Sequence, residues 1–258
     1  MSIIAISDPH GDAEKTEKAI EGIGGLANKK LAVLGDVLDR GLEAVELTDY
    51  LINLLKDDKL ILIRGNHEDL IEDALLEIER GRIWEVATAS HHTINGTFDS
   101  LLQLAQMSVK EAVSYPKELV SRVKKSPYYQ ILLPSCVDFY ETDKYILTHG
   151  WIACNIEGYG REIKYSYSPT WRNASKSDWR RARWLNGMEL ACKYHVIEPN
   201  KTIVCGHWHT SWGHSKILKK CSEWGEDAVF DPFYDDGIIA IDGCVAHSGK
   251  INCIMLED

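Results

Sequence analysis

Residues 30–41 read KLAVLGDVLDRG, and this stretch decides how the chain is expected to fold. The short apolar run at 30–34 predicts a buried strand. Three charged residues, Asp36, Asp39 and Arg40, follow it directly. Because charges beside a buried strand are costly unless they have partners, the segment predicts either a salt-bridged turn or a functional site at the end of the strand.

Short apolar runs alternate with amphipathic stretches on both sides of this segment. Strands are expected at 3–7, 30–34 and 60–63, and helices at 12–22, 42–55 and 68–79. This alternation indicates βαβ units and a largely parallel sheet. Further along, strands are expected at 137–140, 145–148, 202–205, 237–241 and 251–256, a helix at 180–193 and a long loop at 152–178.

Residues 80–135 show helical patterns and no clear strand, which predicts a helical insertion. A length of 258 residues allows one or two domains at about 150 residues each. Neither an internal repeat nor a low-complexity linker marks a boundary. We therefore expect a single α/β domain over 1–258 that carries the insertion at about 80–135.

Composition excludes several classes of protein. The chain is 45% hydrophobic and 26% charged, which is typical of a globular fold. A net charge of −10 argues against strong binding to nucleic acid or to an anionic membrane, although bound metal ions still permit a phosphate-bearing substrate. No apolar run is long enough for a membrane span. The N-terminus shows no signal-peptide pattern, and the seven cysteines are scattered without a CxxC pair. Both features predict reduced thiols and a cytoplasmic location.

Polar clusters follow five of the expected strands. They are Asp8-Pro9-His10, Gly35–Gly41, Arg64-Gly65-Asn66-His67-Glu68, Thr148-His149-Gly150 and Gly206-His207-Trp208-His209. In an open parallel sheet, ligands bind beyond the carboxyl ends of the strands, so these clusters are expected to converge. Each cluster alone is compatible with an ordinary hydrogen-bonded turn. All five together predict a functional site.

The residue types in these clusters suit divalent metals. Carboxylate oxygens and imidazole nitrogens together bind Mn, Fe, Zn or Ni. Asp8 and His10 can aim at one ion, and the two oxygens of Asp36 can bridge it to a second. Neutral ligands for the second ion come from Asn66, His149 and His207. Two ions about 3.5–4 Å apart can clamp a phosphate and lower the pKa of a shared water toward about 7.

The charged residues that remain can assist hydrolysis. Asp39 can accept one ring N–H of His67 and hold its tautomer. The other ring nitrogen, when protonated, can then act as a general acid for the leaving oxygen. Arg40 can grip phosphate oxygens with its guanidinium fork.

These motifs resemble those of the calcineurin-like metallophosphoesterase superfamily, especially bacterial and phage serine/threonine phosphoprotein phosphatases. The resemblance implies a four-layer αββα sandwich of two mixed β-sheets flanked by helices. It implies a first metal bound by Asp8, His10 and Asp36, and a second bound by Asp36, Asn66, His149 and His207. It also implies His67 with Asp39 as the acid pair, and Arg40 with Asn66 as substrate-binding residues.

Two features depart from the phosphoprotein phosphatase pattern. His209 in Gly-His-Trp-His resembles the phosphodiesterase and purple acid branches, in which the second histidine also reaches the first metal. His209 is therefore expected to be either a metal ligand or a neighbour of the ligands. The C-terminal signature of eukaryotic protein phosphatases has no clear copy in this chain.

The resulting expectation is a phosphomonoesterase with two divalent ions, manganese first, in which a bridging hydroxide attacks phosphorus. Its substrate would be a phosphoprotein, a nucleotide or a small phosphate ester. One alternative is a phosphodiesterase or nucleotide hydrolase resembling diadenosine tetraphosphatases, and another is a non-catalytic binding module. Two further features are less specific. Six tryptophans lie between 151 and 212, and they are either core residues or stacking surfaces. A basic segment at 161–183 is either a wall of the site or a solvated loop.

Overall fold

Two mixed β-sheets form the centre of the computed structural model, which describes residues 2–88, 91–158 and 163–257. The first sheet has the order β11-β1-β2-β3. Its strands are β1 (Ser2–Ile6), β2 (Lys30–Val33), β3 (Leu60–Leu62) and β11 (Cys253–Glu257). The first three are parallel, and β11 runs antiparallel to β1.

The second sheet has the order β4-β5-β8-β10-β9. Its strands are β4 (Phe139–Glu141), β5 (Tyr145–Thr148), β8 (Thr202–Cys205), β9 (Phe233–Asp235) and β10 (Ile238–Ala240). The central strands β5, β8 and β10 are parallel, and the edge strands β4 and β9 are antiparallel to their neighbours.

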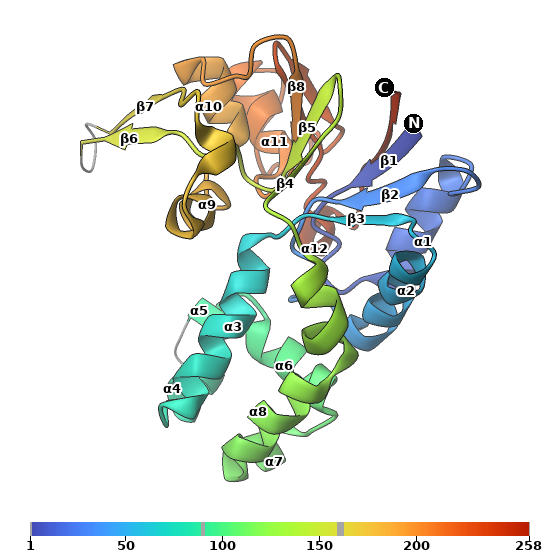
Figure 1. Cartoon of the computed structure of the whole chain (residues 1–258), viewed down its shortest axis with the longest axis vertical. Helices are drawn as coiled ribbons and strands as arrows, with labels where there is room; N and C mark the ends of the chain where they lie inside the picture. The colour runs from blue at the N-terminus through green and yellow to red at the C-terminus, as the bar shows by residue number, and fades with distance from the viewer. Residues whose placement is uncertain (1, 89–90, 159–162, 258) are drawn as a thin grey trace.

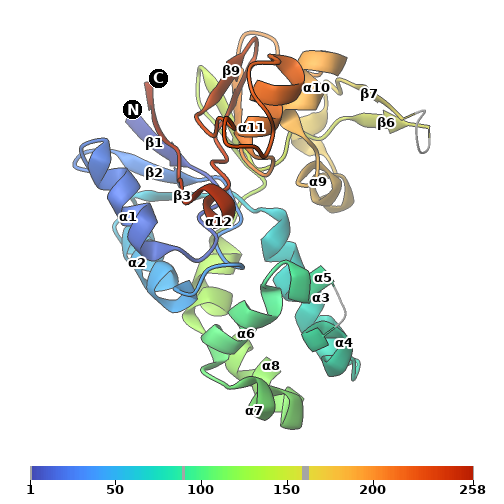
Figure 2. The ribbon, with the colours of Figure 1, turned by 180° about the vertical axis from the view of Figure 1, so that it is seen from behind.

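The strands are nearly continuous apolar runs because both faces of each sheet are covered. One face of the first sheet, including Ala5, Ala32 and Leu34, packs against Leu147 and Val204 of the second. The opposite face of the first sheet packs against α1 (Ala13–Gly22), α2 (Ala44–Lys56) and α3 (Asn66–Glu79). The outer face of the second sheet carries α9 (Lys176–Ala182), α10 (Gly187–Tyr194) and α11 (Thr210–Trp212). The expected four-layer αββα sandwich is thus confirmed (Figures 1 and 2).

Helices that follow α3 extend away from the sheets (Figure 1). They are α4 (Ile83–Thr88), α5 (His91–Ile94), α6 (Thr97–Ala105), α7 (Val109–Ser114) and α8 (Pro116–Lys125). Pro116 stands at the first position of α8, where its missing N–H costs nothing. Leu101 and Leu119 share one hydrophobic core with α2 and α3. This shared core supports our proposal that the insertion and the sheets form one domain.

In the C-terminal half, two expectations are wrong and one strand was missed. The segment 152–178 is no simple loop, because β6 (Asn155–Glu157) and β7 (Lys164–Ser166) form a short antiparallel hairpin. Its exposed, polar strands lack the apolar run by which the other strands are recognised. The single helix expected at 180–193 is divided into α9 and α10, and Asn186 caps the second by accepting the N–H of Glu189 at 3.1 Å. The edge strand β9 was not expected, since Phe233 is its only buried residue.

Candidate metal centre and active site

The loops after β1 and β2 are joined by backbone hydrogen bonds. Asp8 N donates to Gly35 O at 3.3 Å, and His10 N donates to Asp36 O at 3.0 Å. Several non-glycine residues of the predicted site adopt the sparsely populated left-handed conformation: Asp8, His10, Asp36, Asp39, Arg40 and His207. Such conformations cost about 1–3 kcal/mol each and concentrate at functional sites, where the surrounding structure enforces them.

Glu68 ties the second loop to the third. Its carboxylate is fully buried and accepts the backbone N–H groups of Asp36 and Val37, each at 3.0 Å, and of Gly65 at 2.7 Å. A Cβ at Gly65 would lie 2.2 Å from Asp36 Oδ1, so only glycine permits this approach. Sequence reasoning assigned Glu68 no role, although it ends the motif at 64–68.

Two groups of side chains have the geometry to hold a metal ion. They are His10, Asp36 and His67, and Asp36, His149 and His207; within each group the potential ligand atoms lie within 4.8 Å of one another. Asp36 belongs to both groups. Asn66 extends the second group, because its Oδ1 lies 2.9 Å from His149 Nε2.

The hydrogen bonds around His149 fit a metal site. Its Nδ1 donates to Leu34 O at 2.6 Å, so this nitrogen carries a proton. Its Nε2 faces Asn66 Oδ1 and, at 3.3 Å, Asp36 Oδ1. Burial by itself would lower the pKa of His149, but the charge of Asp36 outweighs it and raises the pKa to about 10. The carboxylate of Asp36 thus favours a positive charge at this position, which either a proton or a metal ion can supply.

His10 and His207 are held in the neutral form, which is the form that binds metals. Burial, together with the nearby His67 and Arg40, holds the pKa of His10 well below its usual range. Its Nδ1 donates to Leu38 O at 3.0 Å, which leaves a lone pair on Nε2. Burial and the neighbouring His149 lower the pKa of His207 to about 3.

Two buried carboxylates lie beside these groups. Asp8 Oδ2 accepts the backbone N–H of His207 at 3.0 Å and the hydroxyl of Ser7. Burial and the nearby charge of Asp242 raise the pKa of Asp8. A cation between the two would remove this repulsion. Asp242 was not among the predicted site residues. It could have been found, because Asp242 directly follows the expected strand at 237–241, just as the other site residues follow expected strands.

The predicted acid pair and phosphate clamp lie at the same place. His67 Nδ1 donates to Asp39 Oδ2 at 2.7 Å. Burial opposes protonation of His67, but the charge of Asp36 and the bond to Asp39 raise its pKa. The guanidinium of Arg40 reaches over both histidines, with Nη1 donating to His10 Nε2 at 2.7 Å and Nη2 lying 3.2 Å from His67 Nε2.

A comparison with protein-family models decides the family, because residues 1–211 match the calcineurin-like phosphoesterases. The chain belongs to this family. It is accordingly a metal-dependent phosphoester hydrolase, and this supports the enzyme over the alternative of a non-catalytic binding module. A comparison with curated proteins finds no match.

Several solved structures are similar to this phosphoesterase at low sequence identity. A candidate diadenosine tetraphosphatase is 12% identical, with a TM-score of 0.49 over 99% of this chain and 89% of that one. A cold-active protein-tyrosine phosphatase of a psychrophilic Shewanella species is 14% identical, with a TM-score of 0.49 over 100% and 75%. A protein serine/threonine phosphatase from Saccharomyces cerevisiae is 13% identical, with a TM-score of 0.47 over 94% and 67%.

His209 stands apart from both metal groups of the phosphoesterase. Its Nε2 lies 3.1 Å from Glu223 Oε1, and its ring centre lies 4.2 Å from that of Trp224. Glu223 also pairs with Lys216 at 2.9 Å. Of the two roles that the sequence left open for His209, we propose that of a neighbour of the ligands, since its Nε2 is turned toward Glu223.

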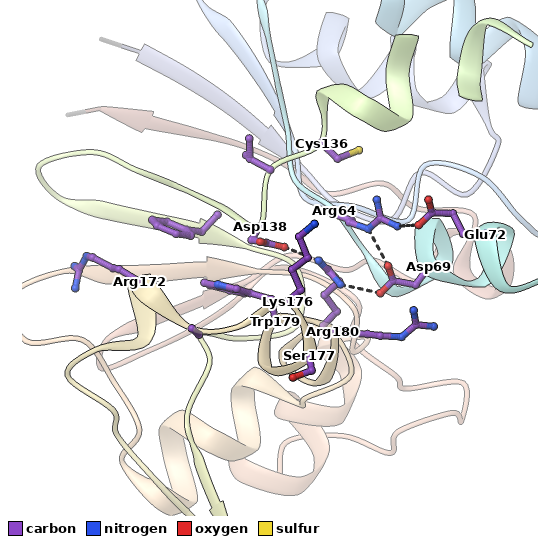
Figure 3. A pocket seen from close by; sticks show the side chains of 14 residues that line it. Arg64, Asp69, Glu72, Cys136, Asp138, Arg172, Lys176, Ser177, Trp179 and Arg180 are labelled. Carbon is purple, nitrogen blue, oxygen red and sulfur yellow. Dashed lines mark hydrogen bonds and ion pairs between the residues drawn. The ribbon is translucent and has the colours of Figure 1, made fainter. Parts of the chain in front are cut away.

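The basic segment lines a cavity of about 790 Å³ between α3, α9 and residues 136–139 (Figure 3). Arg161 and Glu162 of that segment lie outside the described residues. Most cations around the cavity are paired with carboxylates: Arg64 and Arg183 with Asp69, each at 2.8 Å, Arg180 with Asp73, and Arg172 with Glu141. None of the residues of the two metal groups lines this cavity.

In the described part of the chain, no helix is long and apolar enough to cross a membrane.

Proposed function

We propose that the chain is a phosphomonoesterase of the serine/threonine phosphatase type, working with two divalent metal ions. The position of Asp36 supports this proposal most strongly. Asp36 belongs to both candidate metal groups, and its Oδ2 lies 3.7 Å from Nε2 of the acid His67. A carboxylate shared by two ions beside a protonated histidine suits attack on phosphorus and protonation of the leaving group at one place.

The donor atoms divide into two sets. We assign His67 of the first group to proton donation, so that Asp8 would join His10 and Asp36 at one ion. Asp36 would hold the other ion with Asn66, His149 and His207. When bound, such a pair supplies a water of lowered pKa and neutralises charge on the phosphate. We propose manganese, while iron, zinc and nickel suit the same nitrogen and oxygen donors.

The protein side chains then bind phosphate and deliver a proton. The Nε2 lone pair of His10 can either accept the hydrogen bond from Arg40 or bind a metal ion, but not both. Metal binding by His10 would therefore free the guanidinium of Arg40. The freed guanidinium can donate two hydrogen bonds to phosphate oxygens, and the amide of Asn66 can donate another. Asp39 holds the Nδ1–H of His67, which keeps the Nε2 proton directed at the leaving oxygen.

Hydrolysis of 4-nitrophenyl phosphate beside bis(4-nitrophenyl) phosphate tests the proposal. With Mn²⁺ present, faster turnover of the monoester is expected, and EDTA should abolish it. Faster turnover of the diester would contradict the proposal. Turnover that survives EDTA and dialysis would contradict the metal mechanism.

A second candidate, a phosphodiesterase or nucleotide hydrolase, is favoured by the tryptophans near the site. Trp184 is 47% exposed, and its ring stands edge-on to His207 with centres 5.8 Å apart. Trp224 is 52% exposed beside His209. Exposed indoles of this kind can stack a nucleobase. If this candidate is right, His209→Ala should lose diester hydrolysis and keep monoester hydrolysis.

The substrate class and the location are also proposals. A phosphoprotein, a nucleotide or a small phosphate ester would each supply the phosphate group that the proposed metal centre binds. All seven cysteines are free thiols, which supports a cytoplasmic location. A disulfide detected in the purified, alkylated protein would argue against it.

A further inference from the structure

The helical insertion reaches the loop after β2, which carries Asp39 of the proposed acid pair and the phosphate clamp Arg40. Asp39 and Arg40 have φ values of +75° and +67°, so this loop needs support from its surroundings. Ser100 of α6 accepts the backbone N–H of Asp39 at 2.9 Å. Gly96, just before α6, lies so close that a Cβ there would meet Arg40 N at 2.4 Å. The start of α6 therefore packs directly on the backbone of the catalytic loop.

Thr97, the first residue of α6, contacts the acid pair itself. Its hydroxyl donates to Asp39 Oδ2 at 2.6 Å, and the same oxygen accepts His67 Nδ1–H at 2.7 Å. Thr97 and Asp39 are both fully buried, and His67 is 2% exposed. The other carboxylate oxygen, Asp39 Oδ1, is buried without a hydrogen-bond partner in the described part of the structure. The carboxylate is thus oriented through one oxygen, by two donors.

We propose that Thr97 is a positioning residue for the His67–Asp39 pair, an inference that rests on the function proposed above. The terminal torsion of an aspartate is soft, and its carboxylate can rotate when a bond is lost. The Thr97 hydroxyl fixes that rotation, Asp39 then fixes the His67 ring, and the ring directs its Nε2 proton at the leaving oxygen. The insertion is in this way part of the active site.

The test compares leaving groups, because a general acid matters most when the departing oxygen is strongly basic. Thr97→Val removes the hydroxyl at nearly constant volume, and Thr97→Ser keeps it. Thr48→Val is the matched control, since Thr48 is also buried and its hydroxyl donates at 2.6 Å, but to Ala44 O within α2. Each variant is assayed with Mn²⁺ on glycerol 2-phosphate and on 4-nitrophenyl phosphate, and its metal content is measured.

Thr97→Val should lower kcat for glycerol 2-phosphate about tenfold more than for 4-nitrophenyl phosphate, the loss expected when one hydrogen bond of the acid pair is removed. KM and metal content should not change, because Thr97 touches neither substrate nor ligands. Thr97→Ser should recover most of the loss, and Thr48→Val should show no dependence on the leaving group.

Equal losses on both substrates, or the same pattern in Thr48→Val, would overturn the positioning role. So would an unchanged kcat in Thr97→Val. A wild-type protein that hydrolyses neither monoester would instead refute the proposed function, which separates the two failures.

Discussion

Replacing Glu68 by glutamine should destabilise the protein far more than a surface substitution does. The carboxylate accepts three backbone N–H groups, two of them on Oε2 (Asp36 and Gly65) and one on Oε1 (Val37). In Glu68→Gln the amide oxygen can retain the first two bonds. Its NH₂ group then faces the N–H of Val37, and a buried donor is left without a partner.

The size of the effect follows from these bonds. Leaving the Val37 N–H unpaired costs about 1–3 kcal/mol. The two retained bonds pass from a charged to a neutral acceptor and lose roughly half of their strength. Removing a buried charge offsets part of this loss. We therefore expect a decrease of about 2–4 kcal/mol in the free energy of unfolding, or about 5–15 °C in Tm for a chain of this size.

Urea and thermal unfolding of the Mn²⁺-loaded protein measure this change. Glu72→Gln is the control, one turn further along α3, where the side chain is 40% exposed and pairs with Arg64. Arg64 keeps its pair with Asp69 when Glu72 is replaced, so a loss of at most about 1 kcal/mol is expected in this control. Equal losses in the two variants, or a loss below about 1 kcal/mol in Glu68→Gln, would refute the view that this carboxylate joins the loops.

Two further variants test the site and the second sheet. Asp36→Asn should lower kcat by orders of magnitude while the circular dichroism spectrum and melting cooperativity stay intact, because an amide cannot bridge two ions; an active variant would exclude the shared-ligand site. Hydrogen bonds from Arg172 lower the pKa of Glu141 from 4.5 to about 2, so this pair should stabilise the fold above pH 4.5 and stop doing so as the pH falls toward 2. Glu141→Gln should then cost at most about 3 kcal/mol near pH 7, and its difference from wild type in acid titrations of unfolding should vanish by pH 2; a difference that does not depend on pH would contradict this.

The positions of most strands along the chain and the polar residues at their ends could be predicted from the sequence. Apolar runs such as 30–34 are buried on both faces, so their position in the chain is visible without the fold. The hairpin β6–β7 could not be predicted in this way, because its strands are short and exposed. The break between α9 and α10 was also missed, since the helical pattern continues across residues 183–186.

The candidate ligands and the acid pair were recognised as motifs, whereas their supports were not. Glu68 and Thr97 act through hydrogen bonds to residues 32 and 58 positions away, and no local pattern reveals such partners. Asp242 is brought beside Asp8 by the packing of two different sheets. Similarly, only the tertiary structure pairs His209 with Glu223.

The sequence by itself predicted an α/β class from its apolar runs, and its short motifs carried the resemblance that implied the αββα sandwich, the family and the candidate site residues. These depend on hydrophobic periodicity and on short motifs, which are local properties of the chain. Only the tertiary structure decided how Asp36 is shared between two histidine groups, how most cations around the cavity are paired with carboxylates, and how the insertion contacts Asp39. Those outcomes depend on contacts between residues distant in sequence, because burial and hydrogen-bond partners are set by the packing of the whole chain.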